Sequence, residues 1–244
     1  MPTHGRNETM PKKITLISFD LDNTLWPTRK VIGRAERSLR HWLEQHHGAA
    51  AATGLSTNNF WQLRQQVAEA QPHLRHQPTL LRQAVLREGF LASGYSASAA
   101  QEAALLAFDA FIAARNHITF FPQAIDTLRT LAQQYRLVAI TNGNANLERV
   151  GIMPFFTAQY TAEQVGHAKP AAEIYEHMLA EQHISPEHCL HVGDHPVEDI
   201  EAARQCGMQT LWANLTQAQW PAEIAPPERT VTTLGAIPHQ LKQN

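Results

Sequence analysis

The chain has 244 residues, a formal net charge of -2, and 43% hydrophobic and 17% charged residues. Such a composition is typical of a soluble globular protein with one large domain, or with a core domain and a smaller insert. Because neither sign of charge dominates, it argues against nucleic-acid binding and against attachment to a membrane surface. The two cysteines, Cys189 and Cys206, are too few for a disulfide framework and favour a reducing cytosol.

The N-terminal segment is polar and has no apolar stretch of the kind that a signal peptide needs. No run of about 18 apolar residues occurs elsewhere, so no membrane-spanning segment is expected. We therefore predict a disordered extension at residues 1–11 and a cytoplasmic protein. The sequence says nothing about the oligomeric state.

Residues 12–25 form a short β-branched and aromatic run with a polar end, which is typical of a buried strand followed by a loop. Residues 28–117 differ, because their apolar positions recur at three- and four-residue spacing and strand-like runs are absent. Prolines and a Ser-Gly pair divide this block. The pattern predicts four helices, at about 30–47, 56–71, 79–92 and 97–115.

From Pro122 onward, helical segments alternate with short apolar runs, and residues 221–244 are predicted to be a loop with one short closing helix. The alternating elements are, in order, helix 122–134, strand 136–143, helix 171–183, strand 188–194, helix 197–206 and strand 208–214. Such alternation makes right-handed βαβ units and a parallel sheet. We therefore predict an α/β fold, a Rossmann-like parallel sheet core with helices on both faces plus a small all-α cap domain of four helices. The core is assigned to residues 12–27 and 118–244, and the cap to 28–117.

Polar side chains follow the predicted strands, at the end where an open parallel sheet binds its ligands. The candidate site residues come after three of the strands, with one lysine before the third: Asp20 and Asp22, Thr141 and Asn142, Lys169, and Asp194 with Asp199. Ionised carboxylates at such proximity raise each other's pKa unless a cation balances them. Mg²⁺ prefers oxygen ligands and is commonly held by one or two carboxylates together with phosphate oxygens. The sequence therefore predicts a magnesium site.

Four motifs resemble, in order and spacing, those of the haloacid dehalogenase superfamily of phosphohydrolases. They are FDLDNT at 19–24, ITNG at 140–143, Lys169 before Pro170, and GDHPVED at 193–199. The resemblance covers about 12–27 and 118–215, and the helical insert lies where this superfamily places a cap domain, between its first and second motifs. Within the insert, the stretch NNFWQLRQQVAEAQPHLRHQPTLLRQ resembles the branch that contains flavin mononucleotide and pyrimidine nucleotide phosphatases.

The resemblance implies separate roles for the two aspartates of the first motif. Asp20 is expected to be the nucleophile that forms an aspartyl-phosphate, and Asp22 to be the general acid and base. Metal binding is expected from the side chains of Asp20 and Asp194 and from the backbone carbonyl of Asp22. Two unequal tasks would thus explain two aspartates one residue apart.

The remaining motif residues are expected to act on the phosphoryl group. Thr141, with the backbone of Asn142, would bind the transferring oxygens, and Lys169 would offset the charge of the nucleophile and the phosphoryl group. Asp199 is expected to bind the metal through water, to orient Lys169, or simply to be an acidic residue in the first turn of a helix. His195 is interpreted as a partly exposed loop histidine, with an approach to the substrate as the alternative.

Two further residue types invite a functional interpretation. The chain has 14 histidines, but neither cysteine partners nor an HExxH arrangement accompanies them, so we reject a histidine metal site. Trp42 and Trp61 lie at helical spacing among apolar neighbours, and we interpret them as helix core rather than as a platform for a substrate.

The sequence thus predicts a magnesium-dependent phosphatase that hydrolyses a small organic phosphomonoester through an aspartyl-phosphate. The resemblance of the insert implies flavin mononucleotide (FMN) or a nucleotide monophosphate as the substrate. Three alternatives stay open. A carbon-halogen hydrolase uses the same nucleophile, although such relatives lack an acid at the position of Asp22. A phosphomutase would use Asp20 and Asp22 and return the group, and a non-catalytic binding protein could share the fold.

Overall fold

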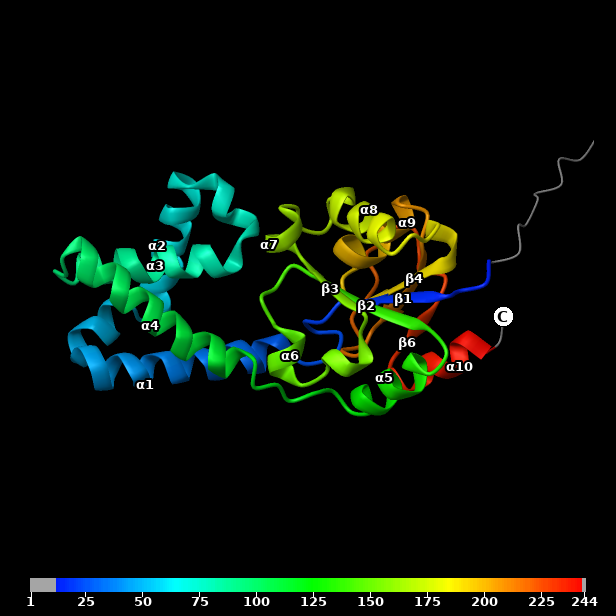
Figure 1. The fold of residues 1–244 in the computed structure, drawn as a ribbon, viewed down its shortest axis with the longest axis horizontal. Coiled ribbons are helices and arrows are strands. Elements are labelled where there is room, and N and C mark those ends of the chain that lie inside the picture. Colours follow the sequence, from blue (N-terminus) through cyan, green and yellow to red (C-terminus); the bar gives the residue numbers. More distant parts are fainter. Residues whose placement is uncertain (1–11, 243–244) are drawn as a thin grey trace, which may run out of the picture.

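The computed structural model describes residues 12–242, apart from the side chains of residues 49–53 and 57–58. The extension predicted for residues 1–11 lies outside the described residues. Within the described part, the chain forms a six-stranded sheet with helices on both faces, and a separate group of helices lies beside it (Figure 1). The predicted α/β fold with an additional set of helices is therefore confirmed.

The sheet has the strand order β3-β2-β1-β4-β5-β6, and all neighbouring strands are parallel. The strands are Leu16–Phe19 (β1), Arg136–Thr141 (β2), Ala158–Thr161 (β3), Cys189–Gly193 (β4), Gln209–Ala213 (β5) and Thr230–Val231 (β6). This is the order of a doubly wound sheet, in which the chain builds outward from β1 first on one side and then on the other. Such a sheet binds its ligands at the carboxyl ends of the strands where the direction reverses, which here are β1 and β4.

The strands β3 and β6 are not predictable from their own residues, because both are too short for a recognisable apolar pattern. β3 has the sequence AQYT, in which Tyr160 alone is buried, and β6 has two residues. Each pairs with a longer neighbour, β3 with β2 and β6 with β5. Their extended conformation therefore depends on sheet pairing rather than on local propensity.

Side chains of the central strands alternate between the two faces of the sheet. On β1, Ile17 and Phe19 belong to one hydrophobic cluster, and Leu16 belongs to another on the opposite face. Helices α5 and α10 contribute to the first cluster and α8 and α9 to the second, so both faces are covered, as an all-parallel sheet requires (Figure 1). These helices are Ala124–Ala132 (α5), Ala172–Glu181 (α8), Ala202–Gln205 (α9) and Ile237–Lys242 (α10). Short elements complete this part: α6 (Leu147–Val150), α7 (Ala162–Val165) and 3₁₀ turns at Met153–Phe155, Pro186–His188 and Leu234–Ala236.

The helix predicted at 197–206 begins with a π-helical segment, Pro196–Glu201, and continues as α9. The N–H of Ile200 donates to the carbonyl of His195, five residues earlier, at 3.3 Å. The His195 ring caps the segment by accepting from two backbone N–H groups. π-Helical turns occur frequently at functional sites. Here the segment carries Asp199, whose side chain is buried.

Four helices between β1 and α5 pack around two hydrophobic clusters of their own, and we call them the helical group. They are Thr28–Gly54 (α1), Thr57–Ala70 (α2), Pro78–Ala92 (α3) and Ala97–Arg115 (α4), with a 3₁₀ turn at Pro72–His76. In Figure 1 the helical group lies beside the sheet, toward the left. α1 runs beyond its predicted end, but it is interrupted at Gly48, where φ is 78°. Glycine adopts such a positive φ without steric cost.

Helix α4 is the helix of the described residues that is long and apolar enough, by length and composition only, to cross a membrane. It packs against α1 and α3 and buries residues such as Ala104 and Phe111 in the core of the helical group. At its start, the Ser96 hydroxyl accepts from the N–H of Ala99 at 3.4 Å. These contacts are those of a core helix with a side-chain cap.

The interpretation of the two tryptophans as helix core is wrong for one of them. Trp42 packs against the cluster between α1 and α4, whereas Trp61 is 58% exposed. The guanidinium of Arg64 lies over the Trp61 ring, 5.6 Å from its centre. Helical spacing identifies a face of α2, but only packing decides whether that face points inward.

Candidate active site

Asp20 and Asp194 lie close together because each follows the last residue of one of two neighbouring strands, β1 and β4. The N–H of Asp20 donates to the carbonyl of Val192 at 2.9 Å, which extends the pairing of the two strands by one residue. A Cβ at Gly193 would lie 2.3 Å from Asp199 Cγ. The glycine therefore allows Asp199 to approach the end of β4, and three carboxylates meet at this edge of the sheet.

Lys169 lies between two of these carboxylates. Its Nζ is 2.7 Å from Asp20 Oδ1 and 2.6 Å from Asp199 Oδ1, and all three side chains are buried. Burial favours the neutral lysine, but the charges of Asp199 and Asp20 outweigh burial and hold the pKa of Lys169 well above its usual value. Burial also favours the neutral Asp199, yet Lys169 and a hydrogen bond from His191 keep the pKa of Asp199 below its usual value. Lys169 and Asp199 therefore form a charged pair.

Burial favours the neutral form of the other two carboxylates, Asp20 and Asp194. Burial raises the pKa of Asp20 well above its usual value, and Asp199 and Asp194 add to this against the opposing charge of Lys169. Burial, and then the charge of Asp199, raises the pKa of Asp194 to about 7. Asp20, Asp194 and Asp199 each offer a carboxylate oxygen, and these atoms lie within 4.8 Å of one another. An all-oxygen donor set with surplus negative charge fits a hard divalent cation such as Mg²⁺.

Thr24 holds the carboxylates in place, and Trp212 holds the backbone of Asp194. The buried Thr24 hydroxyl donates to Asp20 Oδ2 at 2.9 Å and lies 3.5 Å from Asp194 Oδ1. Trp212 Nε1, from β5, donates to the carbonyl of Asp194 at 2.7 Å. Thr24 is the last residue of the FDLDNT motif, so the sequence contains a signal for it, whereas Trp212 carries none.

The end of β2 contributes Thr141 and Asn142. Asn142 clamps the backbone of Lys169, because its Nδ2 donates to the Lys169 carbonyl at 2.9 Å and its Oδ1 accepts from the Lys169 N–H at 2.8 Å. The buried Thr141 hydroxyl accepts from the N–H of Gly143 at 3.0 Å. Its own proton can therefore be donated elsewhere. Asn142 thus sets the position of Lys169, and Thr141, the last residue of β2, presents a hydroxyl donor at the same edge of the sheet.

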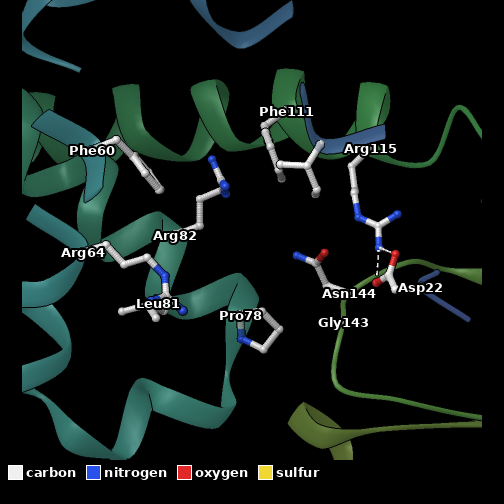
Figure 2. Close-up of a pocket in the computed structure, with 11 residues that line it drawn as sticks. Asp22, Phe60, Arg64, Pro78, Leu81, Arg82, Phe111, Arg115, Gly143 and Asn144 are labelled. Carbon is white, nitrogen blue, oxygen red and sulfur yellow. Dashed lines mark hydrogen bonds and ion pairs between the residues drawn. The ribbon is translucent and has the colours of Figure 1, made fainter. Parts of the chain in front are cut away.

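Asp22 lies where the sheet meets the helical group. Its carboxylate accepts from Arg115 Nη2 at 2.8 and 2.7 Å, from Trp26 Nε1 at 2.7 Å and from the Thr28 hydroxyl at 2.8 Å. Arg115 is buried and is the last residue of α4, so this ion pair joins the helical group to the site (Figure 2). Arg115 is not recognisable from the sequence as a site residue, because a basic residue in the last turn of a helix is ordinary.

A chain of buried polar groups supports Asp199. The Ser18 hydroxyl lies 2.8 Å from His191 Nδ1, and His191 Nε2 lies 3.3 Å from Asp199 Oδ1. Burial lowers the pKa of His191. The backbone N–H of His195 donates to Asp199 Oδ2 at 2.9 Å. Both oxygens of Asp199 thus contact protein groups, which orients this carboxylate toward Lys169. The His195 ring instead accepts a hydrogen bond from the backbone of its own turn.

The family model of haloacid dehalogenase-like hydrolases matches residues 14–207, and the chain belongs to this family. It is 34% identical over 200 residues to the 5-amino-6-(5-phospho-D-ribitylamino)uracil phosphatase YigB of Escherichia coli (strain K12), covering 82% of this chain and 83% of the relative. It is also 34% identical over 143 residues to the pyrimidine 5'-nucleotidase YjjG of the same organism, covering 55% of this chain and 61% of the relative.

Among solved structures, one described as 2-haloacid dehalogenase from Pseudomonas syringae pv. Tomato DC3000 has a TM-score of 0.87 and 33% identity, covering 94% of this chain and 99% of that chain. The two relatives from Escherichia coli are named as a phosphatase and a nucleotidase. Together with the family, they make this protein an enzyme of the phosphoric monoester hydrolase class.

Proposed function

We propose that the protein hydrolyses a small organic phosphomonoester in a Mg²⁺-dependent reaction that passes through an aspartyl-phosphate on Asp20. The observation that carries this proposal is the position of Asp20, at the end of β1, close to Asp194 and 2.7 Å from Lys169 Nζ. A carboxylate so placed can attack phosphorus while the ammonium offsets the charge of the phosphoryl oxygens.

Asp20 and Asp22 divide the reaction between them in this proposal. In the first half, an oxygen of Asp20 forms a bond to phosphorus, the bond from phosphorus to the ester oxygen breaks, and Asp22 gives its proton to the leaving alcohol. In the second half, Asp22 takes a proton from a water molecule whose oxygen attacks phosphorus, and phosphate leaves Asp20. Asp22 lines a cavity that borders the helical group, where a leaving group has room.

Asp194 and Asp20 would hold Mg²⁺ with their side chains, together with the backbone carbonyl of Asp22. When bound, Mg²⁺ offsets the charge of the phosphoryl oxygens and of the clustered carboxylates. The raised pKa values of Asp20 and Asp194, caused first by burial and then by neighbouring carboxylates, support this assignment, because a bound cation would offset the charge of both side chains.

Thr141, the backbone of Asn142, and Lys169 would bind the phosphoryl oxygens, with Asp199 as the residue that positions Lys169. Residues 28–117, which contain the helical group, would act as a cap that closes over the site. Closure would exclude water from the phosphoryl group and select the leaving group. The ion pair between Arg115 and Asp22 supports this, because it already ties the helical group to the catalytic edge of the sheet.

We expect the purified protein to release phosphate from p-nitrophenyl phosphate in the presence of Mg²⁺. Because a bound cation contributes several kcal/mol to the transition state, EDTA should lower the rate by at least about 100-fold, and added Mg²⁺ should restore it. A phosphatase rate that is indifferent to the chelator would contradict the metal dependence.

A carbon-halogen hydrolase is the second candidate, because the Pseudomonas syringae structure with 33% identity carries that description. Its test uses the same protein with 2-chloropropionate and measures chloride. Release of chloride without any release of phosphate would replace the phosphatase proposal by this one. The carboxyl group of Asp22 in the cavity wall favours the phosphatase, since an alkoxide needs a proton on leaving and a halide does not.

For the substrate, we propose a phosphomonoester joined to a heterocyclic ring through a ribityl or ribosyl chain, a class that includes FMN and nucleotide monophosphates. The names of the two Escherichia coli relatives support this class. We expect a higher kcat/KM for 5-amino-6-(5-phospho-D-ribitylamino)uracil, FMN or uridine 5'-monophosphate than for simple sugar phosphates. If sugar phosphates are hydrolysed far faster than all three, the substrate proposal fails.

A further inference from the structure

A cavity of about 190 Å³ lies between the sheet and the helical group, with Asp22 in its wall. Figure 2 shows Asp22 and Arg115 at one end of the cavity, and Arg64 of α2 at the opposite end. In the proposed reaction the ester oxygen lies near Asp22, so the distal part of the leaving group extends toward Arg64. Arg64 is therefore placed to contact the part of the substrate that differs from one phosphomonoester to another.

The side chain of Arg64 is accessible to a ligand in this cavity. Phe60 and Arg64 are four residues apart on α2, so they lie on the same face of the helix, and both line the cavity. Arg64 is partly buried, and none of its side-chain nitrogens is fully buried. Its guanidinium carbon lies 5.6 Å from the ring centre of the exposed Trp61, a contact that leaves the N–H groups free to donate.

Three arginines line the cavity, and two of them have an acidic partner. Arg115 pairs with Asp22 at 2.7 Å, and Arg82 pairs with Glu36 of α1 at 2.8 Å. Arg64 makes no hydrogen bond or ion pair to any residue that the structure describes. Burial lowers the pKa of Arg82, and the charge of Arg64 adds to this shift, so the two guanidinium groups are near enough to repel each other. The end of the cavity away from Asp22 therefore carries a positive charge that no described acidic residue offsets.

We propose that Arg64 binds a carboxylate or carbonyl oxygen at the distal end of the leaving group, so that the enzyme selects alcohols that carry such an oxygen and rejects those that carry a cationic amine. A guanidinium has only donors, in a planar fork that matches such oxygens. This inference rests on the proposed phosphatase function and adds to it a residue that determines specificity. The uracil and isoalloxazine rings of the substrates proposed above carry carbonyl oxygens of this kind.

The test compares alkyl phosphates that end in a carboxylate, a carboxamide or an ammonium group, over a series of chain lengths, by kcat/KM. Carboxylate and carboxamide have nearly the same shape, so their ratio isolates the contribution of charge. At the length that reaches Arg64, we expect the wild-type protein to prefer the carboxylate ester over the ammonium ester by at least about 10-fold, with the carboxamide between them. Arg64→Met should bring the three values together, and Arg64→Glu should reverse their order, which a merely structural role would not do.

Arg75→Met is the matched control. Arg75 belongs to the 3₁₀ turn Pro72–His76 of the helical group, is exposed, and does not line the cavity. Its removal takes one positive charge from the helical group outside the cavity wall and should keep the wild-type order of the three esters, because exposed charges are screened by salt. Arg64→Lys retains the charge and should also keep the order. Circular dichroism checks that each variant folds.

Two kinds of result overturn the inference in distinguishable ways. If the wild-type protein hydrolyses all three esters of every length with equal kcat/KM, or hydrolyses p-nitrophenyl phosphate but none of them, Arg64 does not recognise the leaving group and the phosphatase function stands. The same conclusion follows if Arg64→Met and Arg64→Glu keep the wild-type order. If neither p-nitrophenyl phosphate nor any of these esters releases phosphate while Mg²⁺ is present, the proposed function fails, and the recognition role fails with it.

Discussion

Replacement of Asp20 by asparagine is expected to lower phosphate release by at least about 10³-fold, as when a nucleophile that works as part of a unit is removed. Asparagine has almost the shape of aspartate and retains one oxygen for the hydrogen bond from Thr24, but its amide cannot form the acyl phosphate. The measurement is kcat for p-nitrophenyl phosphate at saturating Mg²⁺. Mass spectrometry of the quenched reaction should show a phosphorylated chain for the wild-type protein and none for the variant.

The matched control for this variant is Asp126→Asn. Asp126 lies on α5, its side chain is 77% exposed, and it pairs with Arg129 at the surface. Exposed pairs contribute about 0–1 kcal/mol to stability, so this variant should fold and turn over like the wild type. Wild-type turnover by Asp20→Asn, with the control equally active, would exclude Asp20 as the nucleophile.

Replacement of Lys169 by methionine is expected to lower the free energy of unfolding by about 3–5 kcal/mol at neutral pH. Lys169 is buried and is the cation closest to two buried carboxylates, at 2.7 Å from Asp20 and 2.6 Å from Asp199. Methionine fills a similar volume but leaves the two buried carboxyl groups without their cation, and this costs more than the lost pairing itself. Urea unfolding followed by circular dichroism measures the change, and phosphate release should also fall.

Lys30→Met provides the control for the loss of a lysine. Lys30 is exposed, in the first turns of α1, and surface substitutions usually change the free energy of unfolding by less than about 0.5 kcal/mol. A loss of under about 1 kcal/mol in Lys169→Met would mean that Asp20 and Asp199 do not depend on this cation for their burial.

Much of the fold is predictable from the sequence, because the hydrophobic pattern of most strands agrees with their buried position in the sheet. The apolar runs that become β1, β2, β4 and β5 are continuous enough to identify as buried parallel strands, and helical patterns separate them. The strands β3 and β6 are beyond this reasoning, since they become strands only by pairing with β2 and β5. The observed ends of helices also differ from the predicted ones, because they too depend on packing. One example is the π-helical segment Pro196–Glu201, whose wide turn places Asp199 in the interior.

The candidate site likewise contains residues that the sequence predicts and residues that it does not. Motif residues such as Asp20 and Asp194 stand at strand ends, and parallel strands bring their carboxyl ends together, so their proximity follows from the order of elements. Arg115 and Arg82 stand in helices where arginine is unremarkable in sequence. Their importance comes from packing: Arg115 is buried and pairs with Asp22, and Arg82 stacks on two phenylalanine rings in the cavity wall.

By itself, the sequence determined the parallel α/β architecture and the family to which the motifs belong, because apolar period and motif spacing are properties of the chain alone. Tertiary structure decided which face of each helix in the helical group points inward, as Trp61 shows by its exposure, and how these helices meet the sheet. It also decided the charge balance around Asp20 and Lys169, since pKa values depend on burial and on distances between groups far apart in sequence. Those long-range distances exist only after packing, and they govern the chemistry that the motifs can perform.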